Sequence, residues 1–265
     1  MDAIEENPEY RFERLETKHY KDLVYISKSA FNIDPGIDYF INKNKTGDFG
    51  ETNLGFVAYH KISNEPAAFY GVYAHPYLYQ GKNYFVVQSG DTMTHINHTG
   101  KGLFTQLAKL TYKLAVQNGA IMVYGFPNDN SYPGFTKKLN WIHRDNIITY
   151  KLKIRTLPLL KLAKKINYFN GLYRQYLKLI NQLYKPSINS FTNTAIDNEK
   201  GGIEHSVSFL NYKRFNGSYL IKINDIHIWI KPDGFLFIGD IEKTNASNLD
   251  SIIKGLKKYA MLIGA

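Results

Sequence analysis

The sequence predicts an α/β fold in its first part and a smaller β-rich module after it. Segments with the spacing of amphipathic helices alternate with apolar, strand-like runs between residues 8 and 154. A polar linker follows at 186–202, and further strand-like runs with a final helix come after it. We therefore expect a domain at 8–154, a basic helical connector with its linker at 155–202, and a β/α module at 203–265.

The elements of the first part follow the order β-α-α-β-β-β-α-β-α-β. Leu23, Ile26 and Ala30 recur at helical spacing, and the turn at 63–66 separates two strand-like runs. Strands are expected at 10–15, 54–62, 67–74, 84–96, 120–126 and 146–154. Helices are expected at 19–31, 35–45 and 103–117, with a short helix that ends at Leu139.

The most informative segment lies between the strand ending at Ile96 and the helix beginning at Leu103. Gly100, Lys101 and Gly102 form a glycine–lysine–glycine turn directly before this amphipathic helix. Glycine lets the backbone approach a ligand closely, and a helix N-terminus presents unpaired N–H groups and the positive end of the helix dipole. This pattern indicates a phosphate-binding turn.

These residues and those after them resemble the GNAT superfamily of acyl-CoA-dependent N-acetyltransferases. The pyrophosphate motif Q/R-x-x-G-x-G/A falls on 97–102, and an Asn followed three residues on by a small residue falls on Asn128 and Ser131. The segment 125–133, GFPNDNSYP, is similar to a bacterial branch of the family, and the second β-rich part resembles the degenerate copy of tandem members. The resemblance implies a GNAT-like mixed twisted sheet with flanking helices and a partial GNAT-like module at 203–265.

The resemblance also implies acetyl-CoA or another acyl-CoA as cofactor, and a primary amine of a small molecule or amino sugar as acceptor. The amine would attack the thioester directly in a ternary complex. Backbone N–H groups of Met93, His95 and Ile96 would bind pantetheine and polarise the thioester carbonyl. The full set of expected cofactor-binding residues is Met93, His95, Ile96, Asn97, His98, Thr99, Gly100, Lys101, Gly102, Leu103, Asn128 and Ser131. Asn97 occupies the glutamine or arginine position of the motif, and His98 would compensate for this replacement.

Three residues are candidates for the chemical step. Asp91 and His95 are the titratable residues on the strand, and strand alternation places both on one face. Asp91 could also hold a cationic amine, and His95 could be a packed strand residue. The tyrosine that the family uses as acid falls near Phe135 or Thr136, so Tyr132 is the substitute, with an aromatic lid as its other role. For Asn128 the alternative role is to stabilise a turn.

Composition excludes several classes of chemistry. The 265 residues include no cysteine, which rules out disulfides, thiolate metal sites and a cysteine nucleophile. No metal site is expected, because the eight histidines form no H-x₃-H pair on a helix. The glycine-rich turn is not a nucleotide P-loop, because Leu103 stands where that motif needs the G-K-[ST] ending. No G-x-S-x-G motif of a serine hydrolase is present. No apolar run or N-terminal signal directs the chain to a membrane or to export, so we expect a cytoplasmic protein.

The net charge of +10 is concentrated in the connector. Residues 151–185 hold nine basic and no acidic side chains, interleaved with leucines. This pattern is typical of a helix pair with one packed and one solvated face, but it also fits an anionic surface or polyanion. Nucleic acid is disfavoured because no nucleic-acid-binding motif accompanies the charge.

The second part is expected to contain strands at 206–209, 218–224, 226–231 and 235–241, then a helix at 249–263. It lacks a glycine-rich turn, which predicts a non-catalytic module that shapes the amine site. Two other function classes stay open: an acyl-CoA-binding module without turnover, and a tRNA-dependent aminoacyl or protein-modifying transferase. The sequence does not indicate the oligomeric state.

Overall fold

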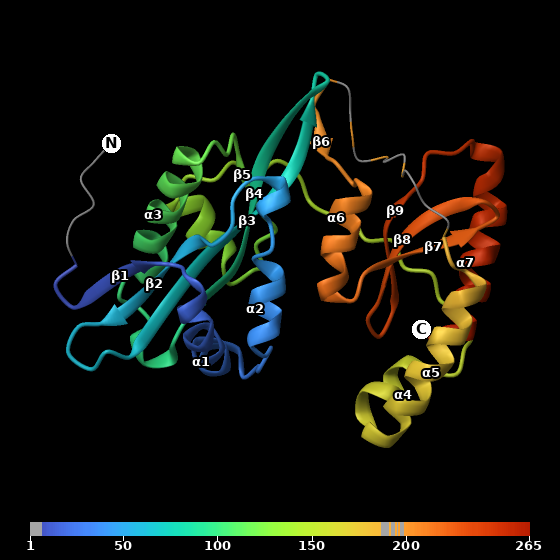
Figure 1. Cartoon of the computed structure of the whole chain (residues 1–265), viewed down its shortest axis with the longest axis horizontal. Helices are drawn as coiled ribbons and strands as arrows, with labels where there is room; N and C mark the ends of the chain where they lie inside the picture. Colours follow the sequence, from blue (N-terminus) through green and yellow to red (C-terminus); the bar gives the residue numbers. More distant parts are fainter. Residues whose placement is uncertain (1–6, 187–190, 192–193, 195, 197–198) are drawn as a thin grey trace. The chain divides into compact units, whose positions relative to one another are not determined.

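The structure is a computed structural model that describes residues 7–186, 191, 194, 196 and 199–265. The chain divides into two compact units, at residues 1–146 and 147–265. Figure 1 shows the elements of both units. The first unit contains strands and helices in the order β1 (Tyr10–Arg14), α1 (Tyr20–Phe31), α2 (Ile37–Lys43), β2 (Leu54–His60), β3 (Pro66–Tyr79), β4 (Lys82–Thr94), α3 (Leu103–Gln117) and β5 (Val123–Tyr124).

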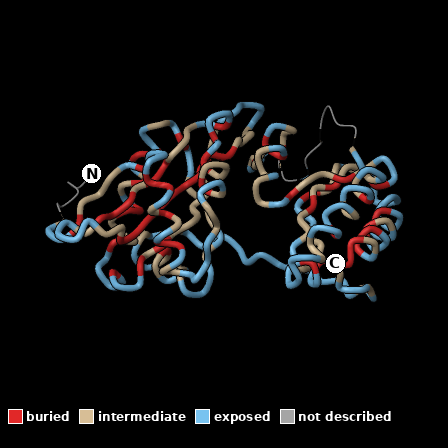
Figure 2. The backbone as a smooth tube through the Cα atoms, turned by 60° about the horizontal axis from the view of Figure 1, so that its bottom comes forward, coloured by how far each residue is buried: buried red, intermediate tan, exposed pale blue. Residues whose placement is uncertain are grey.

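The strands of the first unit form a mixed sheet in the order β1-β2-β3-β4-β5. The pairs from β1 to β4 are antiparallel, whereas β4 and β5 run parallel. Helices α1 and α2 pack on one face of the sheet through a cluster that includes Leu23, Phe40 and Met93. Helix α3 packs on the other face, where Leu103 and Leu107 join the main core. The buried residues of this unit concentrate on the central strands (Figure 2).

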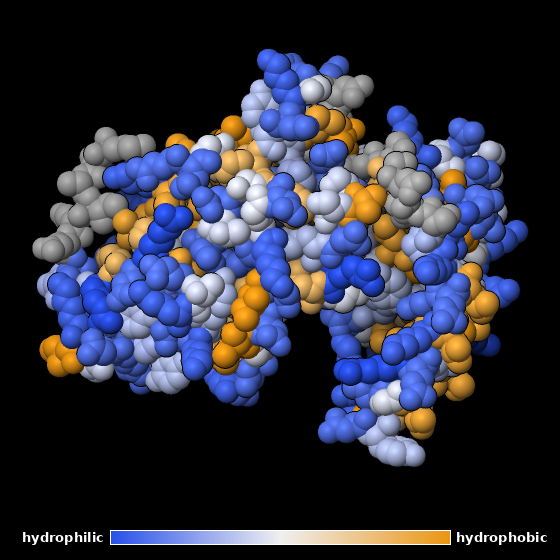
Figure 3. Space-filling view, viewed as in Figure 1, coloured by the Kyte–Doolittle hydropathy of each residue, from blue (hydrophilic) through white to orange (hydrophobic). Residues whose placement is uncertain are grey.

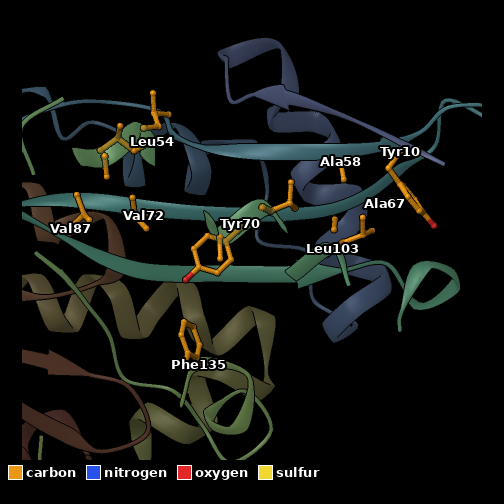
Figure 4. Packing of buried hydrophobic residues seen from close by; sticks show 14 of the residues in the cluster. Tyr10, Leu54, Ala58, Ala67, Tyr70, Val72, Val87, Leu103 and Phe135 are labelled. Carbon is orange, nitrogen blue, oxygen red and sulfur yellow. The ribbon is translucent and has the colours of Figure 1, made fainter. Parts of the chain in front are cut away.

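Tyr70 lies at the centre of the main core, between β3 and α3. Figure 4 shows the Phe135 ring directed toward the Tyr70 ring, and their centroids are 6.5 Å apart. The Tyr70 hydroxyl bonds Ser89 Oγ at 2.7 Å and the Tyr112 hydroxyl at 2.6 Å, so its buried oxygen is satisfied. Trp141 Nε1 donates to the same Tyr112 hydroxyl at 3.1 Å. This network joins β3, β4, α3 and the segment after the π-helical turn Gly134–Lys138.

The second unit packs helices against a three-stranded antiparallel sheet, β7 (Tyr219–Ile223), β8 (Ile226–Pro232) and β9 (Leu236–Ile241). Its core joins isoleucines of β7 and β8 to one face of α7 (Leu249–Ile263) and to Ile180 of α5. The remaining elements are α4 (Leu159–Lys165), α5 (Asn167–Leu183), β6 (Gly202–Ile203) and α6 (Val207–Tyr212).

The basic segment contains the helices α4 and α5, which belong to the second unit. Leu160, Tyr173 and Ile180 are buried, whereas Leu179 and Leu183 are exposed beside the basic side chains. Figure 3 shows hydrophobic and hydrophilic residues side by side over these helices. None of the helices in the described ranges is long and apolar enough to cross a membrane.

Most predicted elements of the first unit are present, and three expectations need correction. The strand expected at 146–154 is absent, because residues 140–158 adopt no helix or strand. Its apolar residues, such as Ile148 and Tyr150, are exposed. The strand expected at 120–126 pairs only at Val123 and Tyr124. In the second unit, Ser206 caps the helix α6 where a strand was expected, and its Oγ accepts from Phe209 N.

The packing of α3 on the sheet predicts a strong effect of truncation at Leu107, which is fully buried. Leu107→Ala should lower the free energy of unfolding of the first unit by about 2–5 kcal/mol, through lost burial and a cavity. Urea denaturation followed by circular dichroism measures this change. Ile62→Ala, at a site that is 90% exposed, is the control, with an expected change within about 0.5 kcal/mol. Equal effects of the two substitutions would contradict the assigned core.

Candidate functional site

The turn before α3 has the geometry of an anion-binding loop. Gly100 and Gly102 have φ values of 76° and 73°, in the left-handed region that favours glycine. Gly102 is the N-cap of α3, and its carbonyl accepts from Thr105 N and Gln106 N. Among the described residues, the backbone N–H groups of Gly100, Lys101, Gly102 and Leu103 have no hydrogen-bond acceptor. These donors lie at the positive N-terminal end of a 15-residue helix, an arrangement suited to a phosphate.

Lys101 supplies the charge of this loop and is held by the N-terminal segment. Its Nζ lies 3.1 Å from Glu9 Oε2, and both side chains are half exposed. The hydrogen bond from Lys101 to Glu9 raises the pKa of the Lys101 ammonium. Exposed ion pairs of this kind contribute little stability. The Lys101 side chain can therefore exchange Glu9 for an anionic ligand at small cost.

The residues before the loop are arranged differently from the expectation. His98 is buried, with Nδ1 2.9 Å from the Tyr10 hydroxyl and Nε2 3.1 Å from Glu65 Oε2. Both ring nitrogens are therefore used inside the protein, and His98 does not assist Asn97 at the loop. Thr99 Oγ1 donates to Ile96 O at 3.1 Å. Asn97 itself is exposed beside the loop.

Strand β4 parts from β5 before it reaches the loop. The parallel pairing includes only Val87 with Val123 and Gln88 with Tyr124. A bulge follows opposite β3, where Asp91 has a φ of 52°. The strand edge beyond Gln88 consequently faces no strand in the described part of the chain.

Because of the bulge, a different set of backbone N–H groups faces this open edge. His95 N donates to Ala67 O at 2.8 Å, and Met93 is the register partner of Phe69 on β3. By strand alternation, the N–H groups of Thr92 and Thr94 point to the opposite, open edge. Ile96 N donates to Ser29 Oγ at 3.1 Å. The sequence predicted that the N–H groups of Met93, His95 and Ile96 face the open edge. In the structure, the N–H groups of Thr92 and Thr94 face it instead.

Asp91 joins a partly buried polar cluster on the α1/α2 face. Its Oδ2 accepts from Lys43 Nζ at 2.7 Å and from the Tyr73 hydroxyl at 2.6 Å. Its Oδ1 has only a 3.5 Å contact with the Tyr39 hydroxyl. Burial lowers the pKa of Lys43, but Asp91 and Tyr39 outweigh burial and raise the pKa overall. Asp91 therefore pairs with a partly buried cation through Oδ2, whereas its Oδ1 makes only one long contact.

His95 lies on the same face but in a separate cluster. Its ring stacks on Tyr25 with centroids 5.2 Å apart, and its Nε2 is 3.7 Å from Glu65 Oε1. Its Nδ1 accepts from Asn97 N at 3.3 Å. The hydrogen bonds from Tyr25 and His98 lower the pKa of Glu65, which receives contacts from both histidines. Among the described residues, His95 and Asp91 have different polar partners, so they do not form one acid–base pair.

The segment after β5 forms a turn closed by its own side chains. Ser131 N donates to Asn128 Oδ1 at 3.0 Å, and Asn128 N donates to Ser131 Oγ at 3.1 Å. Both expected cofactor contacts therefore stabilise the turn. The Tyr132 hydroxyl lies 2.9 Å from His143 Nδ1, and its residue is 39% exposed. Phe135, at the position where the sequence resemblance would place a tyrosine, is buried in the core.

Four residues of these clusters were not found by sequence reasoning: Lys43, Tyr73, Glu65 and His143. Lys43 and Asp91 are 48 residues apart, and Glu65 and His98 are 33 apart. Their pairing comes from the sheet register and the α2 packing, which no local pattern reports. A Tyr124 hydroxyl bonded to His75 Nδ1 at 2.6 Å was missed for the same reason, and burial raises the pKa of this tyrosine.

The Asp91 cluster predicts that loss of the Asp91 charge lowers stability even when the backbone conformation is kept. Asp91→Asn keeps a residue that tolerates positive φ but leaves the Lys43 ammonium without its carboxylate. We expect the free energy of unfolding to fall by roughly 1–3 kcal/mol. Chemical denaturation at neutral pH measures it. Glu16→Gln is the control, because its ion pair with Lys18 is exposed and should contribute less than about 1 kcal/mol. An unchanged stability of the Asp91 variant would show that the pair is not buried as described.

Comparisons with known proteins identify the fold. No protein-family model matches the chain, and no curated protein matches it by sequence. A candidate acetyltransferase from Pyrococcus horikoshii has a similar structure, with a TM-score of 0.54 at 12% identity over 97% of this chain and 78% of the other. An acetyltransferase from Trypanosoma brucei is similar over 54% of this chain and 99% of its own, with 14% identity and a TM-score of 0.44.

An aminoglycoside acetyltransferase from an uncultured soil sample gives a TM-score of 0.41 at 14% identity, over 55% of this chain and 97% of its own. At these identities the likeness concerns the fold alone. The chain therefore has the α/β fold expected from the sequence, a GNAT-like mixed sheet with flanking helices, followed by a second, smaller sheet.

Proposed function

We propose that the chain is an N-acyltransferase that transfers an acetyl or similar acyl group from acyl-CoA to a primary amine. The observation that carries this proposal is the continuity of the open β4 edge with the Gly100–Gly102 loop. One extended ligand with a diphosphate at one end and amide groups at the other matches this arrangement, and acyl-CoA has that chemistry. A bare phosphate would need only the loop.

The diphosphate would lie at the N-terminus of α3. The N–H groups of Gly100, Lys101, Gly102 and Leu103 have no acceptor among the described residues, and the helix dipole favours an anion there. Lys101 would move from Glu9 to a phosphate oxygen. The pantetheine amides would then extend along β4 and accept from the N–H groups of Thr92 and Thr94.

The acyl group would reach the bulge at Asp91. An amine attacks the thioester carbonyl, the new C–N bond forms and the C–S bond breaks, so the amine loses a proton and the CoA thiolate gains one. Backbone N–H groups at the open edge would stabilise the oxyanion that develops during attack. Asp91 Oδ1 is the candidate to hold the entering ammonium and to accept its proton before attack, because Oδ2 is already used by Lys43 and Tyr73.

Tyr132 is our candidate for the acid that protonates the thiolate. Its hydroxyl contacts His143 Nδ1, so the imidazole can return a proton to the phenol from solvent. His95 is assigned no chemical role, since its ring is packed against Tyr25 and contacts Glu65. The acceptor class, a small-molecule amine or amino sugar, rests on the resemblance of the sequence to the GNAT superfamily.

The direct experiment is release of free CoA thiol from acetyl-CoA in the presence of amino sugars, polyamines and aminoglycosides. Acceptor-dependent thiol release supports the proposed reaction. Tight CoA binding without release for any amine would favour a binding module, and salt-dependent RNA binding would favour the tRNA-dependent alternative.

The loop geometry predicts that Gly100→Ala weakens CoA binding. A left-handed φ costs a non-glycine residue about 1–2 kcal/mol, and the added methyl group would meet the diphosphate. We expect a dissociation constant raised by roughly tenfold or more, measured by calorimetry. Gly81→Ala is a matched control, because Gly81 has a φ of 72° and, like Gly100, no atom within 4 Å of an added Cβ. Equal CoA affinity of both variants and the unaltered protein would exclude the loop as the binding site.

Tyr132→Phe tests the acid. The substitution removes one hydroxyl from a partly exposed ring, so CoA binding should be unchanged. The turnover number should fall about 100-fold, the lower range for loss of a general acid. Tyr84→Phe, on an exposed ring of β4 at the far end from the bulge, is the control. If turnover of the Tyr132 variant equals that of the unaltered protein, another group or water protonates the thiolate.

A further inference from the structure

Two histidines and a glutamate converge beside the candidate anion loop. Glu65, His95 and His98 each offer one potential ligand atom, and these atoms all lie within 4.8 Å of one another. Both histidines are 7% exposed, whereas the Glu65 side chain is 29% exposed and opens the cluster to solvent. One carboxylate with two imidazoles is a donor set used for borderline divalent metals such as zinc.

The distances are close to those of a tetrahedral site. Zinc binds imidazole and carboxylate ligands at about 2.0–2.1 Å, so adjacent ligand atoms lie roughly 3.4 Å apart. Here His98 Nε2 is 3.1 Å from Glu65 Oε2, and His95 Nε2 is 3.7 Å from Glu65 Oε1. These two contacts involve different oxygens of Glu65, and the three ligand atoms lie within 4.8 Å of one another, so side-chain rotations must bring one oxygen and both Nε2 atoms to the ion. Three protein ligands leave a coordination position for water.

Other groups behind the ligands support the same arrangement. The Tyr10 hydroxyl lies 2.9 Å from His98 Nδ1, where it can accept the proton of a histidine that binds through Nε2. The Tyr25 hydroxyl donates to Glu65 Oε1 at 2.7 Å and orients the carboxylate. Metal-ligating side chains commonly have such hydrogen-bond partners.

A hydrogen bond to His95 must change when a metal binds. His95 Nδ1 accepts from Asn97 N at 3.3 Å, so a neutral His95 carries its proton on Nε2. Binding through Nε2 moves that proton to Nδ1, and the two N–H groups then oppose each other. The Asn97 amide must give up this long, weak bond. Metal binding would therefore be sensed at the first residue of the segment that leads into the Gly100–Gly102 loop.

We propose that Glu65, His95 and His98 bind a divalent transition-metal ion, with zinc as the best match, that joins the start of β3 to the end of β4 and the turn at Ile96–His98. The ion has a structural role in fastening the loop and takes no part in acyl transfer. Sequence rules for zinc look for ligand pairs on a helix, and this set is assembled from two strand ends and a 3₁₀ turn. The proposal does not rest on the proposed acyltransferase activity.

The test is titration of the full, chelator-treated chain with Co²⁺ and with Zn²⁺. We expect one equivalent of Co²⁺ to give the visible absorption of a low-symmetry, four-coordinate site, and one equivalent of Zn²⁺ to displace it. Thermal unfolding of the first unit should shift upward with Zn²⁺. In the amide spectrum, the Asn97 N–H resonance should move on binding, while that of Gly81 should not.

Three variants distinguish this site from adventitious binding. Glu65→Gln removes the anionic ligand at nearly constant shape and should weaken the metal more than 100-fold. Tyr10→Phe removes only the hydroxyl behind His98 and should weaken it by about 10- to 100-fold. His60→Asn removes a neighbouring imidazole whose ring centroid is 5.6 Å from that of His98, and should leave the affinity unchanged.

Two results would overturn the proposal: no saturable binding at micromolar metal by the unaltered chain, or equal affinity of the Glu65 variant. The first result does not depend on whether any variant folds. CoA binding to the metal-free chain is measured in parallel, so loss of the metal site and loss of the acyl-CoA site can be told apart.

Discussion

The early separation of β4 from β5 is the constraint on which the candidate site depends. The two strands pair only at Val87 and Gln88, and the bulge at Asp91 then changes the side to which the backbone donors point. Without this separation the N–H groups of Thr92 and Thr94 would be used within the sheet. The strand would then present no donors to an extended ligand, and the loop at Gly100 would be an isolated anion site.

A charged residue at the bulge is partly buried next to this edge. Asp91 occupies a left-handed conformation that most side chains avoid, at a point where the strand leaves the regular ladder. Lys43 from α2 and Tyr73 from β3 both bond its carboxylate, so the strained residue is held from a helix and from the neighbouring strand. These two contacts hold the backbone at the bulge in one geometry.

Local features of the site could be predicted from the sequence, and long-range ones could not. Gly100, Gly102 and α3 follow from glycine conformation and from helical spacing over consecutive residues. Strand alternation correctly places Asp91 and His95 on one face, but the pattern cannot report the bulge, which redirects the N–H groups from Met93 and His95 to their neighbours. The partners Lys43 and Glu65 come from elements far apart in the chain. The strand expected at 146–154 shows that a local pattern can also mislead. Apolar residues alternate with polar ones there, yet the segment forms no strand.

Residues 7–10, which lead into β1, contact the region of the glycine turn. Asn7 Nδ2 donates to Gln106 Oε1 on α3, Glu9 pairs with Lys101, and the Tyr10 hydroxyl contacts His98. These three contacts hold residues 7–10 against the glycine turn and the segments on either side of it. A shortened protein that begins at Arg11 would retain most of β1 but lose all three contacts. Trimming of the N-terminus for crystallisation should therefore stop before Asn7.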